Sequence, residues 1–310
     1  RTFMAYRSNM PRFLLVVLWI ISFVLLWMQV FSPFPRSRTN SFANRIPCRN
    51  SSNALVGQMP IDYEYLSTVS ENVTGDLKLG GYYLPEYCIP EVYTAIIIPY
   101  RDRMIHLFRF LRHYHPLLQR QKIAYRIFCV AQMDDSGFNR GKLMNVGYVE
   151  AKKYRSWDCY VFHDVDHLLE NDNLIYSCGS APTLFSTAIE KNGYKLPYGA
   201  FFGGVTALTG EQMEKVNGYS NAYWGWGGED DDIYQRISKS GYKVIQINHK
   251  LGRYATQKHS QAEPYPQRHA LLGSWEKRWP NDGIKTLKYS VLARNELPLY
   301  TQIDVNLGKN

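Results

Sequence analysis

Short runs of β-branched and apolar residues alternate with longer amphipathic stretches through the middle of this chain. The segments YTAIIIPY (93–100), YRIFCVAQ (125–132) and DCYVFHDVD (158–166) are typical of buried strands. The apolar residues of 103–119 lie on one helical face, and residues 138–153 predict a second helix that leads into the third strand. This alternation of strand and helix predicts an α/β domain with a mostly parallel central sheet.

Two segments near the C-terminus follow a different pattern. KTLKYSVL (285–292) and TQIDVNL (301–307) alternate apolar and polar residues, which predicts strands at the edge of the sheet.

In open α/β sheets, ligands bind beyond the carboxyl ends of the strands. Polar residues that directly follow an apolar run are therefore the first candidates for a site.

A long apolar segment precedes this domain. Residues 13–31 contain no charged residue over nineteen positions, and about 20 apolar residues span a bilayer as a helix. The segment ends without the small-residue cleavage site of a secretory signal, which favours an uncleaved signal anchor. The arginines before it favour a cytoplasmic N-terminus only slightly. We expect a cytoplasmic tail (1–12), one transmembrane helix (13–31), a stem rich in Pro, Ser and Arg (32–47) and a lumenal domain (48–310).

The composition of the chain also indicates its cellular compartment and its partners. The net charge of +9 indicates a basic surface, but the chain has no zinc-finger spacing, RNA-recognition signature or basic helix, which disfavours nucleic acid as a partner. Five cysteines without a C-x-x-C pair fit two disulfides and one free thiol in an oxidising lumen. Asn50-Ser51-Ser52 and Asn72-Val73-Thr74 are glycosylation acceptor patterns.

Two polar segments directly follow predicted strands. In PYRDR (99–103), Arg101 and Arg103 suit bidentate binding of phosphates, and Tyr100 suits stacking on a base, although a solvated loop explains them equally well. In FHDVD, Asp164 and Asp166 point the same way if the backbone is extended. Two such carboxylates suit a hard divalent cation, so the segment predicts a metal and nucleotide-sugar site.

The segment YWGWGGEDDD (223–232) combines aromatic, flexible and acidic residues. One carboxylate suits a general base, and Trp224 or Trp226 suits the apolar face of a sugar. EDDDIYQRI also suits a helix start, where acids complement the helix dipole, and the two interpretations are compatible. Farther along, His259 is a candidate imidazole ligand, although an isolated histidine is more often a surface or core residue.

Several of these segments, in order, resemble one family, the metazoan β-1,4-galactosyltransferases and their β-1,4-N-acetylgalactosaminyltransferase relatives. They include AIIIPYRDR, FNRGKLMNVG, DCYVFHDVD, LPYGAFFGGVTALT, VNGYSNAYWGWGGEDDDIYQRI, EPYPQR and PLYTQIDV, and the resemblance covers roughly residues 45–306. It implies a GT-A-like nucleotide-sugar-binding domain and a single-pass type II Golgi membrane protein. It also implies a manganese-dependent, inverting transfer from UDP-galactose or UDP-N-acetylgalactosamine. The acceptor would be the 4-hydroxyl of terminal N-acetylglucosamine on a glycoprotein or glycolipid.

The resemblance also implies roles for individual residues. Asp230 resembles the catalytic base, and Asp166 and His259 resemble metal ligands. The residues that resemble donor and UDP contacts are Pro99, Tyr100, Arg101, Arg103, Phe138, Arg140, Asp164, Val165, Lys191, Phe201, Gly204, Trp226 and Glu229. Those that resemble acceptor contacts are Tyr198, Gly228, Asp231, Arg268, His269 and Leu272. The implied disulfides are Cys48–Cys88 and Cys159–Cys178, which leave Cys129 free.

The chain departs from the family pattern at several of these positions. Thr256 stands where the family has a methionine metal ligand, which predicts an altered metal preference, and neighbouring Gln257 is a possible substitute. Phe201 stands where a tyrosine favours galactose; its bulk favours galactose, whereas the missing hydroxyl eases entry of an acetamido group. His269 and Leu272 replace Phe and Ile of the acceptor pocket, and the segment between KHS and EP is three residues shorter than in the family.

Two other functions remain to be weighed. A catalytically inactive sugar-binding protein of the same fold is the alternative, which the missing methionine favours and the intact acidic residues disfavour. A glycoside hydrolase also uses paired acids, but it needs neither a nucleotide pocket nor the D-x-D pair.

Overall fold

One central β-sheet organises the part of the chain that the computed structural model describes, namely residues 46–48, 54–63, 76–260 and 262–308. The short strand β1 (Tyr82–Tyr83) pairs with β3 beside the main path. Along that path the strands lie in the order β11 (Ser290–Glu296), β12 (Thr301–Asn306), β3 (Ala124–Gln132), β2 (Tyr93–Tyr100), β4 (Cys159–His163), β8 (Val205–Leu208), β6 (Thr183–Leu184) and β9 (Ile245–Gln246).

The sheet is mixed, so the prediction of a mostly parallel sheet is correct for its centre and for the outer pair β6–β9 but not for the whole sheet. Strands β12, β3, β2 and β4 run parallel to one another. Outside them, β11 pairs antiparallel with β12, and β8 pairs antiparallel with both β4 and β6. The short connection from β11 to β12 permits only a hairpin, because a parallel crossover needs a dozen or more residues.

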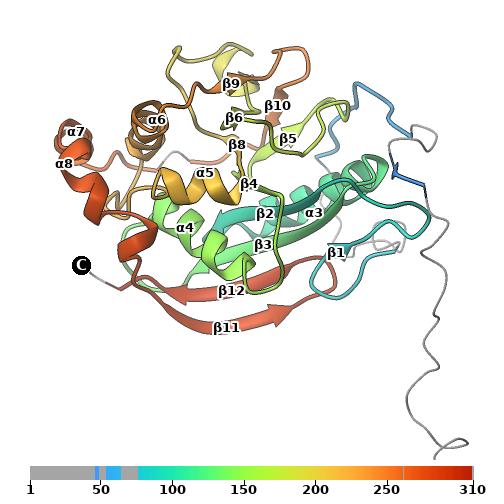
Figure 1. The fold of residues 1–310 in the computed structure, drawn as a ribbon, viewed down its shortest axis with the longest axis horizontal. Coiled ribbons are helices and arrows are strands. Elements are labelled where there is room, and N and C mark those ends of the chain that lie inside the picture. Colours follow the sequence, from blue (N-terminus) through green and yellow to red (C-terminus); the bar gives the residue numbers. More distant parts are fainter. Residues whose placement is uncertain (1–45, 49–53, 64–75, 261, 309–310) are drawn as a thin grey trace, which may run out of the picture. The chain divides into compact units, whose positions relative to one another are not determined.

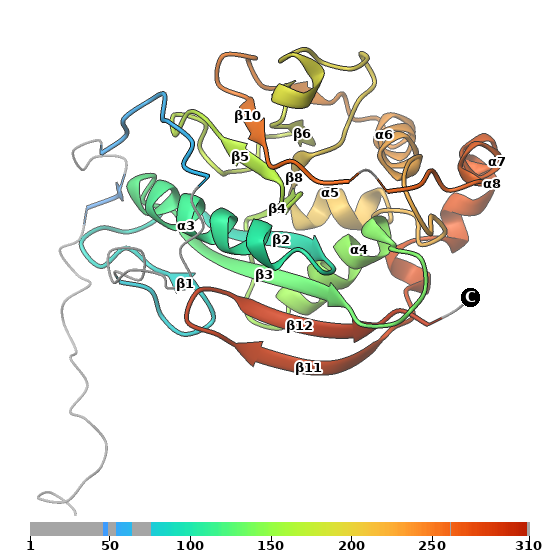
Figure 2. The same cartoon turned by 180° about the vertical axis from the view of Figure 1, so that it is seen from behind.

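Two helices cover opposite faces of this sheet because the side chains of β2 alternate. Ile96 and Ile98 belong to the same buried cluster as the apolar face of α3 (Met104–Arg120). Ala95 and Ile97 belong to a second cluster with α4 (Arg140–Ala151). Figure 1 shows α4 in front of the sheet, and Figure 2 shows α3 in front of it from the opposite side.

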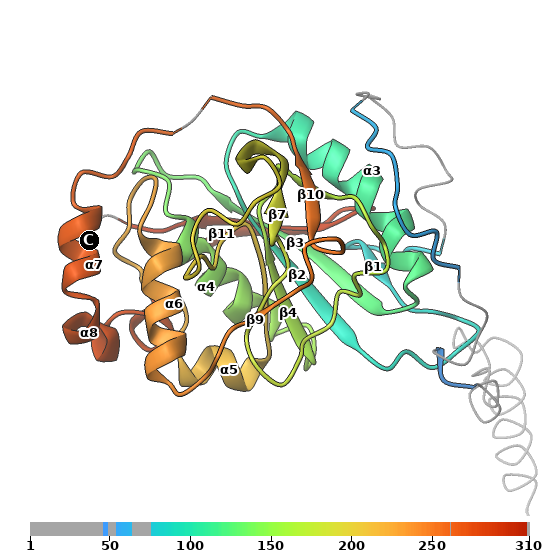
Figure 3. The ribbon, with the colours of Figure 1, turned by 90° about the horizontal axis from the view of Figure 1, so that it is seen from above.

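A second, smaller sheet and a group of helices complete this unit. In the smaller sheet, β10 (Arg253–Thr256) lies between β5 (His167–Leu169) and β7 (Ala188–Ile189). Figure 3 shows α6 beside the α7–α8 pair. The remaining elements are α5 (Gly210–Lys215), α6 (Glu229–Lys239), α7 (Arg268–Gly273), α8 (Trp275–Arg278) and the 3-10 turns η2 (Glu190–Asn192), η3 (Trp279–Asn281) and η4 (Ile284–Thr286).

The structure confirms most of the predicted elements within the described residues. The first strand has the predicted bounds, and the first helix begins at Met104. The predicted strand 285–292 is partly wrong, because residues 284–286 form η4 and β11 begins at Ser290. Both implied disulfides, Cys48–Cys88 and Cys159–Cys178, are present, and Cys129 is free and buried.

Several predictions lie outside the described residues. They concern the anchor segment 13–31, most of the stem, and the acceptor patterns at Asn50 and Asn72. None of the helices among the described residues is long and apolar enough to cross a membrane.

The contact between α4 and β2 gives a test of the packing. A Cβ added to Gly147 would overlap Ile97 Cγ2 and lie 3.0 Å from Val130 Cγ2. We expect Gly147→Ala to lower the free energy of unfolding by about 1–3 kcal/mol, since overpacking a core forces side chains and backbone to shift. Urea unfolding under non-reducing conditions measures this change.

Gly210→Ala is the matched control, because its added Cβ would meet its nearest neighbour, Tyr160, at an ordinary 3.5 Å. This change should leave stability equal or slightly higher, since alanine loses less entropy in a helix than glycine. Equal effects of the two substitutions would contradict close packing at Gly147.

Candidate active site

Functional side chains from distant segments meet beyond the carboxyl ends of the central strands. Arg101 and Arg103 follow β2, and Asp164 and Asp166 follow β4. The D-x-D pair lies in the turn between β4 and β5, so the expected extended backbone is wrong at this point. The turn nevertheless brings ligand atoms of Asp164, Asp166 and His167 within 4.8 Å of one another.

The guanidinium of Arg140, at the start of α4, joins three carboxylates of the site. Its Nε donates to Asp164 Oδ1 at 2.6 Å, and its Nη1 lies 2.6 Å from Asp230 Oδ1 and 3.3 Å from Glu229 Oε1. Burial alone would lower the pKa of Arg140, but the charges of these three carboxylates raise it well above its usual value. Arg140 therefore stays charged and holds the D-x-D turn against the first residues of α6.

Glu229 and Asp230, the first two residues of α6, differ in the hydrogen bonding of their carboxylates. Burial, followed by the charges of Glu229 and Asp164, raises the pKa of Asp230 to about 8 against the opposing effect of Arg140. Burial also raises the pKa of Glu229, and its buried Oε2 has no hydrogen-bond partner among the described residues. A carboxylate oxygen left without a partner in this way is suited to accept a hydrogen bond from a ligand hydroxyl.

Glycine at position 203 allows Asp230 to approach the backbone of the segment that directly precedes β8. A Cβ on Gly203 would overlap Asp230 Oδ2. The next residue, Gly204, has a φ of 74°, which only glycine adopts at low cost, and its carbonyl accepts a hydrogen bond from Asp164 N at 3.0 Å. The FGG segment therefore contacts both Asp230 and the D-x-D turn.

The oxygen and nitrogen atoms around Asp166 fit a divalent cation. Asp166 Oδ2 lies 3.3 Å from His259 Nε2, and Asp166 Oδ1 lies 3.0 Å from His167 Nδ1. Burial alone would raise the pKa of Asp166, but its interaction with His167 and hydrogen bonds from both histidines hold it well below its usual range. An ionised carboxylate flanked by imidazoles is a donor set that suits first-row divalent metals.

Thr256 lies at the end of β10, close to this donor set. Its backbone N–H donates to Glu190 Oε2 at 2.9 Å, and its Cα is paired with that of His167 across the antiparallel strands. The neighbouring Gln257 donates its amide N–H to Val165 O at 3.0 Å and to His106 O at 3.1 Å. The Gln257 side chain therefore ties the end of β10 to the D-x-D turn and to α3.

Two of the predicted phosphate-binding arginines are held by protein partners near the metal-site residues. Arg103 Nη2 lies 3.2 Å from His259 Nδ1. Arg101 Nη1 donates to Ser136 O at 2.7 Å, and its guanidinium lies over the ring of Phe138 with a centroid distance of 5.3 Å. The positive charge of Lys191 also contributes to the low pKa of Asp166. Lys191 and, through His259, Arg103 therefore place positive charge near Asp166.

The residues predicted to contact the acceptor lie on the other side of Asp230. The hydroxyl of Tyr198 donates to Asp231 Oδ1 at 2.7 Å, and Gly228 caps α6 with a φ of 99°. The guanidinium of Arg268 lies over the half-exposed ring of Trp226 at 5.8 Å. His269 and Leu272 follow Arg268 on α7, where His269 is exposed.

The segments that carry Trp226 and Arg268 are joined through their backbones. Trp226 N donates to Glu263 O at 3.3 Å, and Tyr265 N donates to Trp226 O at 2.9 Å. These two hydrogen bonds place the WGWGG segment against the EPYPQR segment. The predicted donor and acceptor residues therefore lie on connected parts of the chain.

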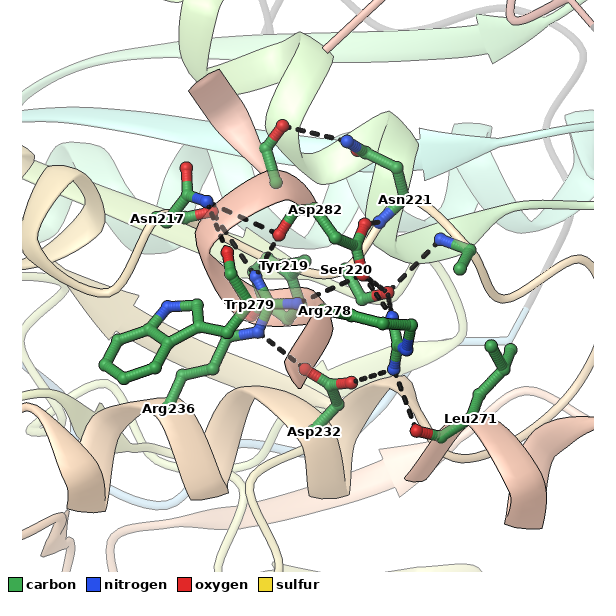
Figure 4. A network of polar contacts seen from close by, with 12 residues as sticks. Asn217, Tyr219, Ser220, Asn221, Asp232, Arg236, Leu271, Arg278, Trp279 and Asp282 are labelled. Atoms are coloured by element: carbon green, nitrogen blue, oxygen red, sulfur yellow. Dashed lines mark hydrogen bonds and ion pairs between the residues drawn. The ribbon is translucent and has the colours of Figure 1, made fainter. Parts of the chain in front are cut away.

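Behind the site, buried ion pairs fix α6, the helix that carries Asp230 (Figure 4). Arg236 is fully buried and donates through Nε to Asp232 Oδ1 at 2.6 Å and through Nη1 to Asp282 O at 2.7 Å. Arg278 Nη2 donates to Asp232 Oδ2 at 2.8 Å and to Leu271 O at 2.9 Å. Arg278 also forms an ion pair with Asp282. Asp232, predicted only to start the helix, thus also anchors it from inside.

Sequence patterns missed His167 and the residues behind α6. His167 directly follows the D-x-D pair, and that adjacency was the available signal. Arg278 lies 46 residues beyond its partner Asp232, and Asp282 lies 46 residues beyond its partner Arg236, so no local motif marks either pair.

Comparisons with known proteins agree with this geometry. The family described as the N-terminal region of glycosyl transferase group 7 matches residues 48–179, and the one described as the N-terminal domain of galactosyltransferase matches residues 183–260. β-1,4-Galactosyltransferase 2 of Cricetulus griseus is 41% identical over 270 residues, which cover 85% of this chain and 73% of that protein. β-1,4-Galactosyltransferase 1 of Bos taurus is 42% identical over 282 residues, which cover 89% and 69%.

A solved structure with the same fold is that of a mutant of Drosophila β-1,4-galactosyltransferase 7 in complex with manganese, UDP-Gal and xylobiose. It is 29% identical to this chain, with a TM-score of 0.60, and the match covers 71% of this chain and 95% of that one. The fold is therefore GT-A-like with a mixed sheet.

The ion pairs behind α6 give a stability prediction. We expect Arg236→Met to lower the free energy of unfolding by about 3–5 kcal/mol, because it leaves the buried carboxylate of Asp232 short of a partner. Chemical denaturation followed by tryptophan fluorescence measures the loss.

Lys239→Met on the same helix is the control, since Lys239 pairs with Glu276 at the surface. We expect no measurable change there, because exposed ion pairs contribute little. If Arg236→Met lowered the free energy of unfolding as little as Lys239→Met, the network would not anchor α6.

Proposed function

The chain belongs to the β-1,4-galactosyltransferase family, and from this premise we propose that it transfers galactose from UDP-galactose to the 4-hydroxyl of terminal N-acetylglucosamine, with inversion at the anomeric carbon. The observation that carries the proposal is the arrangement around Arg140. One guanidinium joins a metal-site carboxylate, Asp164, to a candidate base, Asp230, and to Glu229 with its unsatisfied oxygen. Glycoproteins and glycolipids are the proposed acceptor carriers.

Asp230 is the proposed general base. Its carboxylate takes the proton from the acceptor hydroxyl as that oxygen attacks the anomeric carbon from the face opposite UDP. The raised pKa of Asp230 makes it a stronger base than an ordinary aspartate, and a base whose pKa lies near the operating pH is the most effective one. The unpartnered Oε2 of Glu229 is placed to accept a hydrogen bond from a donor-sugar hydroxyl.

The metal ion proposed for this site is manganese, with Asp166 and His259 as its ligands. When bound, such an ion neutralises charge that develops on the leaving diphosphate. Arg101, Arg103 and Lys191 supply positive charge around the same turn from the protein itself. The remaining proposed donor contacts are Pro99, Tyr100, Phe138, Val165, Phe201, Gly204 and Trp226.

The acceptor is proposed to bind between α6 and α7. Tyr198 and Asp231 are hydrogen-bonded to each other, and Arg268 lies over Trp226. Gly228, His269 and Leu272 complete the proposed contacts. The backbone bonds between the Trp226 and Glu263–Tyr265 segments couple the donor side to the acceptor side, so that movement of one segment moves the other.

The chain is proposed to be a single-pass type II protein of the Golgi membrane, with residues 48–310 in the lumen. The uncharged run of residues 13–31 supports an anchor. The two disulfides support an oxidising lumen around the folded part.

Substituting the proposed base tests the function. We expect Asp230→Asn to reduce kcat for transfer from UDP-galactose to a β-N-acetylglucosaminide by about 10²–10⁴-fold, because the amide cannot take the proton. Affinity for UDP, measured by calorimetry, should change little, since Asp230 is not a proposed phosphate contact.

Asp135→Asn, at an exposed carboxylate, is the matched control and should keep wild-type turnover. Undiminished transfer by Asp230→Asn would overturn the assignment of the base. Binding of UDP-galactose without transfer by the wild type would instead favour a catalytically inactive sugar-binding protein.

Phe201 gives a separate prediction about the donor. Its ring lies edge-on to Tyr198 with a centroid distance of 5.7 Å, and it restricts space beside Gly203. We expect the wild type to prefer UDP-galactose, and Phe201→Leu to raise the ratio of kcat/KM for UDP-N-acetylgalactosamine to that for UDP-galactose by about tenfold, because a smaller side chain admits the acetamido group. A wild-type preference for UDP-N-acetylgalactosamine would show that ring bulk does not set donor choice.

A further inference from the structure

His167 stands out among the buried histidines by its position beside the metal-site carboxylate. It is the first residue of β5 and is 1% exposed, and its Nδ1 lies 3.0 Å from Asp166 Oδ1. Its ligand atom falls within 4.8 Å of those of Asp164 and Asp166. This close grouping of two carboxylates and an imidazole makes His167 a candidate metal ligand.

Other buried histidines have the bonding expected of structural residues. In His115, Nδ1 faces Tyr125 Oη and Nε2 faces Leu299 O, both at 2.8 Å. In His163, Nδ1 faces Asp164 O and Nε2 faces the hydroxyls of two tyrosines. By contrast, His167 Nε2 has no hydrogen-bond partner within the described residues, and Nδ1 faces only the Asp166 carboxylate. The one nitrogen of His167 with a partner in the described part of the chain, Nδ1, therefore faces a metal-site carboxylate and not a backbone carbonyl or a tyrosine hydroxyl.

The strand pairing places His167 on the correct face for coordination. Residues paired directly across antiparallel strands project to the same face, and His167 is paired with Thr256. Of the two side chains, the imidazole is the stronger ligand for a first-row metal, because a neutral threonine hydroxyl binds such ions weakly. The imidazole of His167 thus lies directly opposite Thr256, the residue that stands in place of the family's methionine ligand.

The spacing of the donor atoms also fits a shared coordination sphere. With metal–ligand bonds of about 2.1 Å in an octahedral site, adjacent ligand atoms lie about 3 Å apart. Asp166 lies 3.0 Å from His167 Nδ1 through one oxygen and 3.3 Å from His259 Nε2 through the other. Each imidazole is therefore at the distance expected of a neighbouring ligand from one oxygen of Asp166, and the His167 ligand atom also lies within 4.8 Å of that of Asp164.

We propose that His167 is a protein ligand of the metal, which gives this chain a centre of two imidazoles and the Asp166 carboxylate. The inference rests on the proposed metal-dependent function and adds a ligand to it. A second imidazole shifts the preference of the centre towards metals that favour nitrogen, such as Co²⁺ and Zn²⁺, relative to Mg²⁺.

Pulsed electron paramagnetic resonance of the Mn²⁺-loaded protein tests the inference directly, because it detects ¹⁴N nuclei bound to the ion. We expect two coordinated imidazole nitrogens in the wild type and one in each of His167→Leu and His259→Leu. Affinity for Mn²⁺ alone, measured by calorimetry without nucleotide, should fall by at least tenfold in His167→Leu. His249→Leu is the matched control, since His249 is exposed, and it should keep two nitrogens and full affinity.

The possible outcomes separate the inference from the proposed function. One coordinated nitrogen in the wild type, lost in His259→Leu and kept in His167→Leu, would overturn the ligand role of His167 and leave the metal site intact. No coordinated nitrogen in the wild type would overturn the metal site itself. The number of coordinated nitrogens in the wild type decides between these cases even if His167→Leu fails to fold.

Discussion

The arrangement of this site depends on one guanidinium surrounded by acids. Without Arg140, the carboxylates of Asp164, Glu229 and Asp230 would repel one another in a partly buried space. With it, the D-x-D turn after β4 and the first turn of α6 are held together, although they lie 65 residues apart in sequence. The same contact limits how far burial raises the pKa of Asp230, which keeps this residue able to ionise, as its proposed role of base requires.

A pair of acids next to each other on α6 thus serves two opposite sides of the helix. Asp231 faces the surface, where it accepts a hydrogen bond from Tyr198. Asp232 faces the interior, where it joins two arginines. Because Arg278 also binds the carbonyl of Leu271, the interior network fixes α6 relative to α7. The position of the proposed base Asp230 relative to the proposed acceptor residues on α7 is therefore constrained by buried ion pairs.

Local sequence patterns predicted the centre of the fold well because its strands are short, continuous apolar runs. They failed where a distant residue decides the conformation. The expected strand at 285–292 begins late because Asn217 binds the backbone of Ile284 and Lys285 and turns the chain. The sheet was expected to be mostly parallel, but the direction of its outer strands depends on the length of each connection and on pairing partners that periodicity does not reveal. In the same way, the acids of α6 suggested a helix start, and the inward role of Asp232 needed the positions of its partners.

The metal-site residues show the same contrast between local sequence patterns and contacts with distant residues. The spacing of Asp164 and Asp166 is readable from the sequence, whereas the position of His167 opposite Thr256 follows from the register of β5 and β10, which are more than 80 residues apart. A weak ligand on one strand can be compensated by a stronger one on its neighbour, because directly paired residues share a face. The threonine at position 256 is therefore weak evidence for an inactive protein. Whether such a site retains a metal depends on all the ligands that the fold brings to it, and here the fold adds an imidazole where the sequence pattern lacks a thioether.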